Sequence, residues 1–229
     1  MAKNTITAAD VLSEQWLRFR ISLRMNDRIY GGIPKHPDAI YAFAKRSLPE
    51  AAPDVGDVAE DHADAVDADE EAELGYTVFR KNDDHGLYIE GRQAKAMMKE
   101  CANILKKRLN LTAAKARVAE RFFVEEPEIY LMRDGSYVTE PDGQLVGAIH
   151  VTTRQGPRTA IKKQDYVANA DLTFTVKALN EPMETKDKKK IHPEDMLKII
   201  LDYGQDIGLG KDRSQGGGTF QVTTIAAIP

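Results

Sequence analysis

Residues 16–25 constrain the fold most, because apolar and polar side chains alternate there without interruption. A period of two is typical of a β-strand, whose successive side chains point to opposite faces of a sheet. One face of the predicted strand is apolar, and the other carries Arg18, Arg20 and Arg24. The chain therefore contains a sheet with one buried and one polar face, as antiparallel sheets often have. A solvated face and a nucleic-acid surface explain the arginines equally well.

The order of the other expected elements indicates the fold class. Helical periodicity begins at Arg92 and again at Pro193, with Gly204 ending the second helix, and a shorter helix follows Pro37. Further strands are expected at 76–80, 87–90, 128–132, 136–138, 145–152, 171–178 and 219–226. This order predicts one α+β domain over residues 1–229. The expected architecture is a ferredoxin-like or RNA-recognition-motif-like antiparallel sheet, with helices on one face and inserted loops.

Composition limits the class of protein and its location. No apolar run of the 229 residues approaches the length of a membrane span. Residues 1–15 carry charges where a signal peptide needs an apolar core. We therefore expect a cytoplasmic protein without a membrane partner. The single Cys101 excludes an internal disulfide framework, and its place on an apolar helix face favours a core residue.

Charge is distributed unevenly along the chain. All 11 acidic residues between 47 and 79 lie in a stretch without Lys or Arg, which leaves 25 acidic against 32 basic residues elsewhere, a formal +7. Residues 50–74 contain too few large apolar side chains to fold alone, so they predict a mobile acidic insertion. A solvated insertion is favoured over a partner-binding arm. The basic remainder is compatible with binding a polyanion.

A glycine-rich segment, residues 208–218, connects the last helix to the last strand. Its glycines allow close approach of backbone to a ligand, and its exposed N–H groups and cations suit phosphate. The order of residues is not that of a nucleotide P-loop, and a tight helix-to-strand connection is the alternative. The candidate phosphate-binding residues of this segment are Gly208, Gly210, Lys211, Arg213, Ser214, Gly216 and Gly218.

Two further groups of cations are candidates. Arg92 and Lys95 lie in the first turn of a predicted helix, where backbone N–H groups also favour an anion, and Lys99 follows them. The solvated face of an amphipathic helix is the alternative interpretation. A long basic loop is expected at 153–170, and loops of that length are usually functional or disordered. Its cations are Arg154, Arg158, Lys162 and Lys163.

Three segments together resemble the RAMP superfamily of CRISPR-associated proteins. Residues 208–222 are similar to the family's C-terminal glycine-rich loop and strand, and residues 87–99 to its strand that leads into a helix facing the guide RNA. Residues 154–176 resemble its basic loop followed by a strand. The chain departs from the family pattern in three places: Glu90 replaces a proline, Arg92-Gln93 a serine pair, and Gly217 an aromatic residue.

The resemblance is nearest to the repeated backbone subunit of CRISPR effector complexes. It implies that the chain grips the sugar-phosphate backbone of a guide RNA, leaves bases free to pair with a complementary target, and needs no cofactor to do so. It also implies head-to-tail assembly with copies of itself and contacts with other effector subunits. The implied RNA ligands are the sheet arginines and the cations and glycines named above.

Two alternatives remain. Some subunits of this kind cut target RNA with an aspartate after the first strand, where this chain has Asp27, with His36 and Asp38 nearby. That reaction would need Mg²⁺, whereas loop aspartates commonly cap turns. The other alternative is a non-catalytic structural or interaction protein, which the acidic insertion supports because its carboxylates could occupy a cationic groove.

Overall fold

The protein is described from a computed structural model, which covers residues 15–35, 76–153 and 156–229. The chain divides into two compact units, each built from separate stretches of sequence. Unit 1 comprises residues 1–29, 81–139 and 168–229, and unit 2 comprises residues 30–80 and 140–167. The helix expected after Pro37 and the acidic insertion at 50–74 lie outside the described residues.

Unit 1 contains the main sheet of the protein. Its strands run in the order β10-β9-β13-β1-β16, and β7 also pairs with β13. The strand β1 (Trp16–Met25) pairs antiparallel with β13 (Asp171–Leu179) on one side and β16 (Phe220–Ile228) on the other. The shorter strands are β7 (Phe122–Val124), β9 (Met132–Arg133) and β10 (Ser136–Tyr137). The first strand has the bounds that its alternation predicted.

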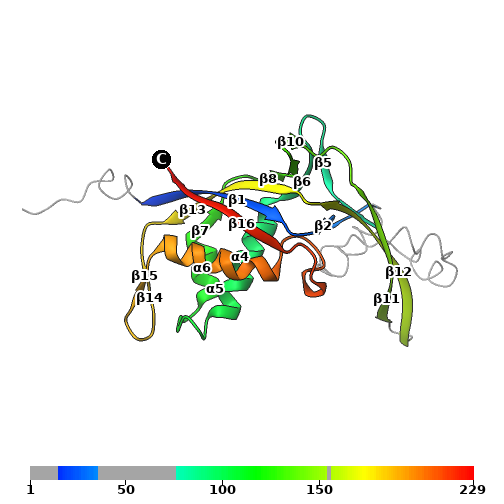
Figure 1. Ribbon diagram of the computed structural model, residues 1–229. Coiled ribbons are helices and arrows are strands. Elements are labelled where there is room, and N and C mark those ends of the chain that lie inside the picture. Colours follow the sequence, from blue (N-terminus) through cyan, green and yellow to red (C-terminus); the bar gives the residue numbers. More distant parts are fainter. Residues whose placement is uncertain (1–14, 36–75, 154–155) are drawn as a thin grey trace, which may run out of the picture. The chain divides into compact units, whose positions relative to one another are not determined.

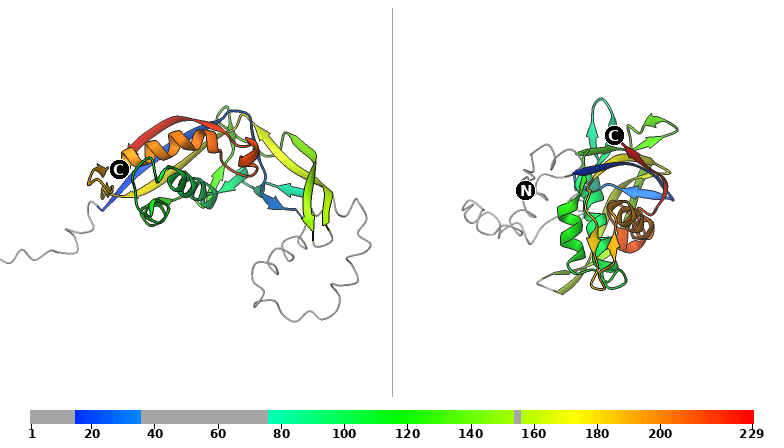
Figure 2. Two further views of the ribbon diagram at one scale, coloured as in Figure 1. Left: turned by 90° about the horizontal axis from the view of Figure 1, so that it is seen from below. Right: turned by 90° about the vertical axis from the view of Figure 1, so that its left-hand side faces the viewer.

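Helices cover one face of this sheet. The helices α4 (Gly91–Leu105), α5 (Ala114–Arg121) and α6 (Pro193–Ile207) lie on the same side of β1 and β13 (Figures 1 and 2). In chain order, β1, α4, β7, β13, α6 and β16 form a βαββαβ unit whose four strands lie in the order β16-β1-β13-β7. This is the ferredoxin-like arrangement, so the predicted α+β class is confirmed.

The core lies between the sheet and the helices. Phe19, Ile21 and Leu23 on the apolar face of β1 are at most 2% exposed. They share the core with Met97 and Met98 of α4, which are fully buried, and with apolar residues of α6 and β13. Each such side chain contributes about 1.5–3 kcal/mol by leaving water, so this layer dominates the stability of unit 1.

Gly204 does not end α6, contrary to the prediction from the sequence. The helix continues to Ile207 and ends at Gly208, which has a φ of 83°. Gly204 is buried where a Cβ would lie 2.8 Å from the Sδ of Met97. The glycine therefore allows α6 to pack closely on α4. Helix α5 was not predicted, because only Ala114 and Val118 of it are buried and the apolar period is weak.

Smaller strands complete unit 1. One three-stranded sheet contains β5 (Arg80–Asn82), β6 (Gly86–Glu90) and β8 (Glu128–Tyr130), and a separate hairpin contains β14 (Met183–Glu184) and β15 (Lys190–Ile191). The predicted turn between β9 and β10 is confirmed. Asp134 and Gly135 both have positive φ, 49° and 79°, as the two-residue turn of a twisted hairpin requires.

Unit 2 is built on a long hairpin. The strands β11 (Gly143–Thr153) and β12 (Gly156–Ala168) pair along their length, and β4 (Tyr76–Val78) runs parallel to β12. The strands β2 (Arg28–Tyr30) and β3 (Ile33–Pro34) complete this sheet.

The loop predicted at 153–170 is thus wrong over most of its length, since residues 156–168 form a strand. The large apolar side chains of this hairpin do not mark one buried face, since Val146 of β11 is 61% exposed and Ile161 of β12 is 45% exposed. The sequence there carries no clear alternation that would predict a strand.

Candidate nucleic-acid interface

The three arginines of β1 lie on the open face of the main sheet, opposite the buried side chains that face the helices. Glu125 forms an ion pair with Arg18 at 2.5 Å, and Asp171 forms one with Arg24 at 2.8 Å. Arg20 has no carboxylate within ion-pair distance among the described residues. Arg18, Arg20 and Arg24 therefore share the polar face that the alternation predicted. Arg20 is the one best placed to accept an external anion.

Lys95 occupies a different position from the one expected. Its Nζ donates to the backbone oxygens of Val118, at 3.3 Å, and Ala119, at 2.7 Å, in the last turn of α5. The same nitrogen lies 4.3 Å from the ring centroid of Phe123. Desolvation, with a smaller effect of the charge on Lys99, lowers the pKa of Lys95 to about 8. Lys95 thus joins α4 to the last turn of α5, where the oxygen of Val118 also accepts the backbone N–H of Phe122.

Two further candidate cations, Arg92 and Lys99, lie on α4. The side chain of Arg92 is 73% exposed and pairs with Glu90 at 2.5 Å. Lys99 is half-buried on the same helix, one residue before Glu100. Both can reach an anion without breaking the packing of the core.

The glycine-rich loop lies against α4, as the interface predicted from the sequence requires. Arg213 Nη1 lies 2.7 Å from Oε2 of Glu100, beside Lys99. Arg213 and Ser214 belong to a short 3₁₀ turn, η1 (Arg213–Gln215), and Lys211 precedes it in a half-buried position. Two predicted segments, more than one hundred residues apart in the sequence, thus share one surface of unit 1.

Several backbone N–H groups of this loop are bonded within the protein and are therefore not free for phosphate. Gly208 donates to Gly204 at 2.9 Å, Gly216 to Arg213 at 3.0 Å, and Gly218 to Arg28 at 2.9 Å. Gly208, Gly210, Gly216 and Gly218 all have positive φ. A Cβ on Gly218 would lie 1.8 Å from the backbone oxygen of Leu209. At least Gly208 and Gly218 are thus needed for the loop's own packing.

Unit 2 carries the cations of the hairpin. Arg154 lies outside the described residues, and Arg158 pairs with Val151 in the register of β11 and β12. Lys162 and Lys163 follow on β12, half-buried, and Lys163 Nζ lies 4.8 Å from the ring centroid of Tyr76. The hydroxyl of Tyr76 donates to Asp165 Oδ1 at 2.7 Å, and burial raises the pKa of Tyr76 to about 12.

Asp27 lies between β1 and β2 with a side chain that is 78% exposed, 3.7 Å from Arg28. The described part of the chain holds no cluster of three or more His, Cys, Asp or Glu side chains that could bind a metal ion. His36 and Asp38 lie outside the described residues.

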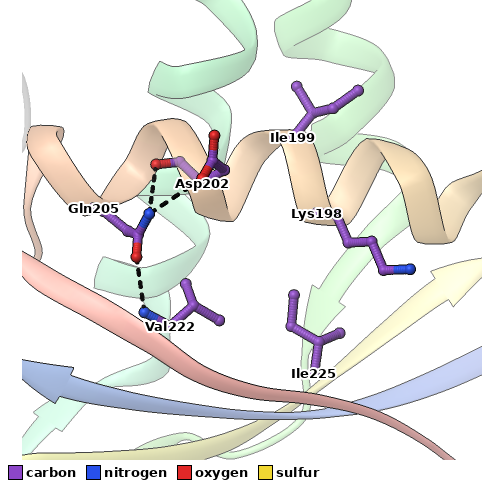
Figure 3. A pocket seen from close by; sticks show the side chains of 6 residues that line it. All are labelled: Lys198, Ile199, Asp202, Gln205, Val222 and Ile225. Carbon is purple, nitrogen blue, oxygen red and sulfur yellow. Dashed lines mark hydrogen bonds between the residues drawn. The ribbon is translucent and has the colours of Figure 1, made fainter.

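An open groove runs between α6 and β16 (Figure 3). Ile199, Val222 and Ile225 give it an apolar lining. Gln205 crosses it, accepting a hydrogen bond from the backbone N–H of Val222 at 3.0 Å and donating to Asp202. None of the predicted RNA-binding residues lines this groove, so it is separate from the candidate interface.

Sequence reasoning missed an aromatic pair on the open face of the main sheet. The rings of Trp16 and Phe123 meet edge to face with centroids 5.6 Å apart. Lys177 Nζ lies 4.7 Å from the centroid of Trp16. Trp16 could have been found, because it continues the alternation of Arg18 and Arg20. Phe123 could not, because the short strand β7 carries no recognisable period.

The described part of the chain includes no helix that is both long enough and apolar enough to cross a bilayer. No protein-family model matches the sequence, and no curated protein matches it. The fold is similar to a chain in a cryo-EM structure of a Type III-B Cmr-beta complex bound to cognate target RNA. The two chains are 14% identical, and the TM-score is 0.45. The match covers 95% of this chain and 62% of the other, and at this TM-score it identifies neither a family nor a function.

Proposed function

We propose that this chain is an RNA-binding subunit of a CRISPR-type ribonucleoprotein, which grips the sugar-phosphate backbone of a guide RNA. The observation that carries the proposal is the contact between the glycine-rich loop and α4. Arg213 Nη1 lies 2.7 Å from Oε2 of Glu100, the residue that follows Lys99 in α4. The loop and α4 come from two of the three segments that resemble the RAMP superfamily.

Phosphate would bind by exchange with carboxylates. Arg92 pairs with Glu90 through an exposed ion pair, which is weak in water, and Arg213, whose side chain is 29% exposed, pairs with Glu100. A phosphate offers a guanidinium a bidentate partner with more negative charge, so replacing the carboxylate is favourable. Lys99 and Lys211 would add charge beside them. Such contacts carry no sequence information, which suits a subunit that accepts many guides.

In this proposal the bases of the guide stay free to pair with a complementary target. Copies of the chain would assemble head to tail along the RNA, together with other subunits of the effector complex. The cations of β11 and β12, among them Lys162 and Lys163, would contact RNA or a neighbouring subunit.

The test is the salt dependence of binding to a single-stranded RNA of guide length. The variant carries Arg92→Gln, Lys99→Gln and Arg213→Gln. A matched control loses the same charge on the exposed hairpin of β14 and β15, through Lys186→Gln, Lys188→Gln and Lys190→Gln. Since each phosphate contact contributes about 0.7 to the log-log salt slope for single strands, the first variant is expected to lose about 2 and the control much less.

Equal losses in the two variants would contradict this location of the interface. Copurification provides an independent check. The chain expressed with its genomic neighbours is expected to retain discrete RNA of guide length, whereas preparations free of nucleic acid, with no RNA binding in titrations, would overturn the proposal. Loss of affinity for one sequence alone would argue against backbone recognition.

A further inference from the structure

The open face of the main sheet carries an aromatic pair, Trp16 and Phe123, beside several cations. In the register of β1, β13 and β7, Lys177 lies opposite both Arg18 and Phe123. Residues directly opposite on neighbouring strands project to the same face. Arg18, Lys177 and Phe123 therefore share the face that is turned away from the helices. Trp16 lies two residues before Arg18 and projects to that face as well.

The aromatic pair is accessible. Phe123 is 42% exposed, although a core position would bury such a large apolar side chain. The ring centroids of Trp16 and Phe123 are 5.6 Å apart. Lys177 lies over the ring of Trp16, and Lys95 lies over the ring of Phe123. Apart from the tryptophan and phenylalanine rings, this face is mainly polar or charged. Ser22 and Thr173, for example, exchange a hydrogen bond at 3.2 Å across β1 and β13.

The charge beside the aromatic pair favours a polyanion. Glu125 is paired with Arg18. Neither Arg20 nor Lys177 has a carboxylate within ion-pair distance in the described parts of the chain. Aromatic side chains beside available cations are the combination that binds single-stranded nucleic acid, since bases stack on the rings and phosphates meet the cations.

We propose that Trp16 and Phe123 stack unpaired bases of single-stranded RNA, while Arg20 and Lys177 hold the adjacent phosphates. This site rests on the proposed function, and it adds a contact to bases on the open sheet face. It is distinct from the phosphate contacts of α4 and the glycine-rich loop. Because every base has a π-face, the site would tolerate any sequence.

Trp16 is the only tryptophan of the chain, so its fluorescence reports on this site directly. The full chain is titrated with a single-stranded oligouridine RNA and, separately, with inorganic polyphosphate, which has the charge but no bases. RNA is expected to quench the emission of Trp16 on binding. Polyphosphate is expected to compete for binding and leave the emission nearly unchanged.

A matched pair of variants tests the contribution of stacking to affinity. Phe123→Ala is expected to weaken RNA binding about tenfold or more and to leave polyphosphate binding unchanged. Tyr137→Ala removes an aromatic ring of similar exposure, 45% against 42%, from β10 and is expected to have little effect on either ligand. Thermal unfolding of each variant checks that the fold is retained.

The outcomes separate the two proposals. RNA binding without quenching, and without loss in Phe123→Ala, would overturn the stacking site and leave the phosphate contacts intact. Equal quenching by polyphosphate would also overturn stacking, because no base is then involved. Absence of RNA binding by the unaltered chain, with and without its genomic neighbours, would overturn both proposals and favour a protein partner for this face.

Discussion

Cations that look equivalent in the sequence have different environments in the structure. Lys95 is held by backbone carbonyls of α5, whereas Lys99, one turn later on α4, is not. On β1, Arg18 and Arg24 have carboxylate partners and Arg20 has none among the described residues. The partners Glu125 and Asp171 are more than one hundred residues away in the chain, so periodicity alone could not reveal them.

The close packing around Gly218 in the glycine-rich loop predicts that this position does not tolerate a side chain. Gly218→Ala would bring a Cβ to 1.8 Å from the backbone oxygen of Leu209 at a φ of +73°. Relieving that overlap requires the backbone to move, which would disturb the hydrogen bonds of Gly218 with Arg28 and Leu209. We expect a loss of about 3 kcal/mol or more in the free energy of unfolding, measured by urea denaturation.

Gly216→Ala is the matched control. Its φ is +79°, and a Cβ there would meet nothing within 4 Å, so only the strain of the left-handed conformation remains. That strain costs about 1 kcal/mol. Equal losses in the two variants would show that the close approach at Gly218 does not limit the loop.

Among the elements, those with one buried face could be predicted and those without one could not. The strand β1 and the start of α6 follow from alternation and from Pro193. The strand β12 and helix α5 were missed, because neither carries a regular apolar period: Gln164 and Asp165 are among the buried residues of β12, and only Ala114 and Val118 of α5 are buried. The prediction that Gly204 ends α6 was wrong, because a glycine that ends a helix and a glycine that allows a second helix to pack closely cannot be told apart in a sequence.

The contact of Lys95 in α4 with backbone carbonyls of α5 predicts a pH dependence of stability. Burial lowers the pKa of Lys95 from 10.5 to about 8, so the folded protein releases this proton more readily than the unfolded chain. Below pH 8 the cost of burying the charge is fully present, and it is relieved as the pH rises from 8 to 10.5. The unaltered chain should therefore gain stability relative to Lys95→Met across this window.

The gain is expected to be about 1 kcal/mol, because Lys95 is half exposed and solvent screens its charge. Urea denaturation of both proteins at a series of pH values measures it. Cys101 and the tyrosines, whose pKa values are raised, also titrate at alkaline pH, and their contributions cancel in the difference between the two proteins. Parallel stability curves would contradict this account of Lys95.

At the scale of the whole molecule, the sequence predicted the order of elements in unit 1 and not the existence of unit 2. The ferredoxin-like frame follows from the succession of strands and helices, which local patterns reveal. The sheet of β2, β3, β4, β11 and β12 joins strands that are far apart in the chain, and pairings over such separations leave no local pattern. The sequence also grouped the glycine-rich loop with α4, and the two are in contact in the structure, whereas the contact of Trp16 with Phe123 depends on the register of β7.

The acidic segment at residues 50–74 is expected to weaken the binding of RNA. Residues 50–74 hold 11 acidic side chains and no Lys or Arg, in a protein of net charge −4. Replacing them with a Gly/Ser sequence of equal length would change the net charge to +7. Because RNA is repelled by the carboxylates and attracted by the rest of the chain, we expect the replacement to strengthen binding of single-stranded RNA about tenfold at about 0.1 M salt. The difference should vanish near 1 M salt, where charges are screened beyond about 3 Å. Equal affinity at low salt would contradict an electrostatic role for this segment, and a lower melting temperature would instead make it part of the folded core.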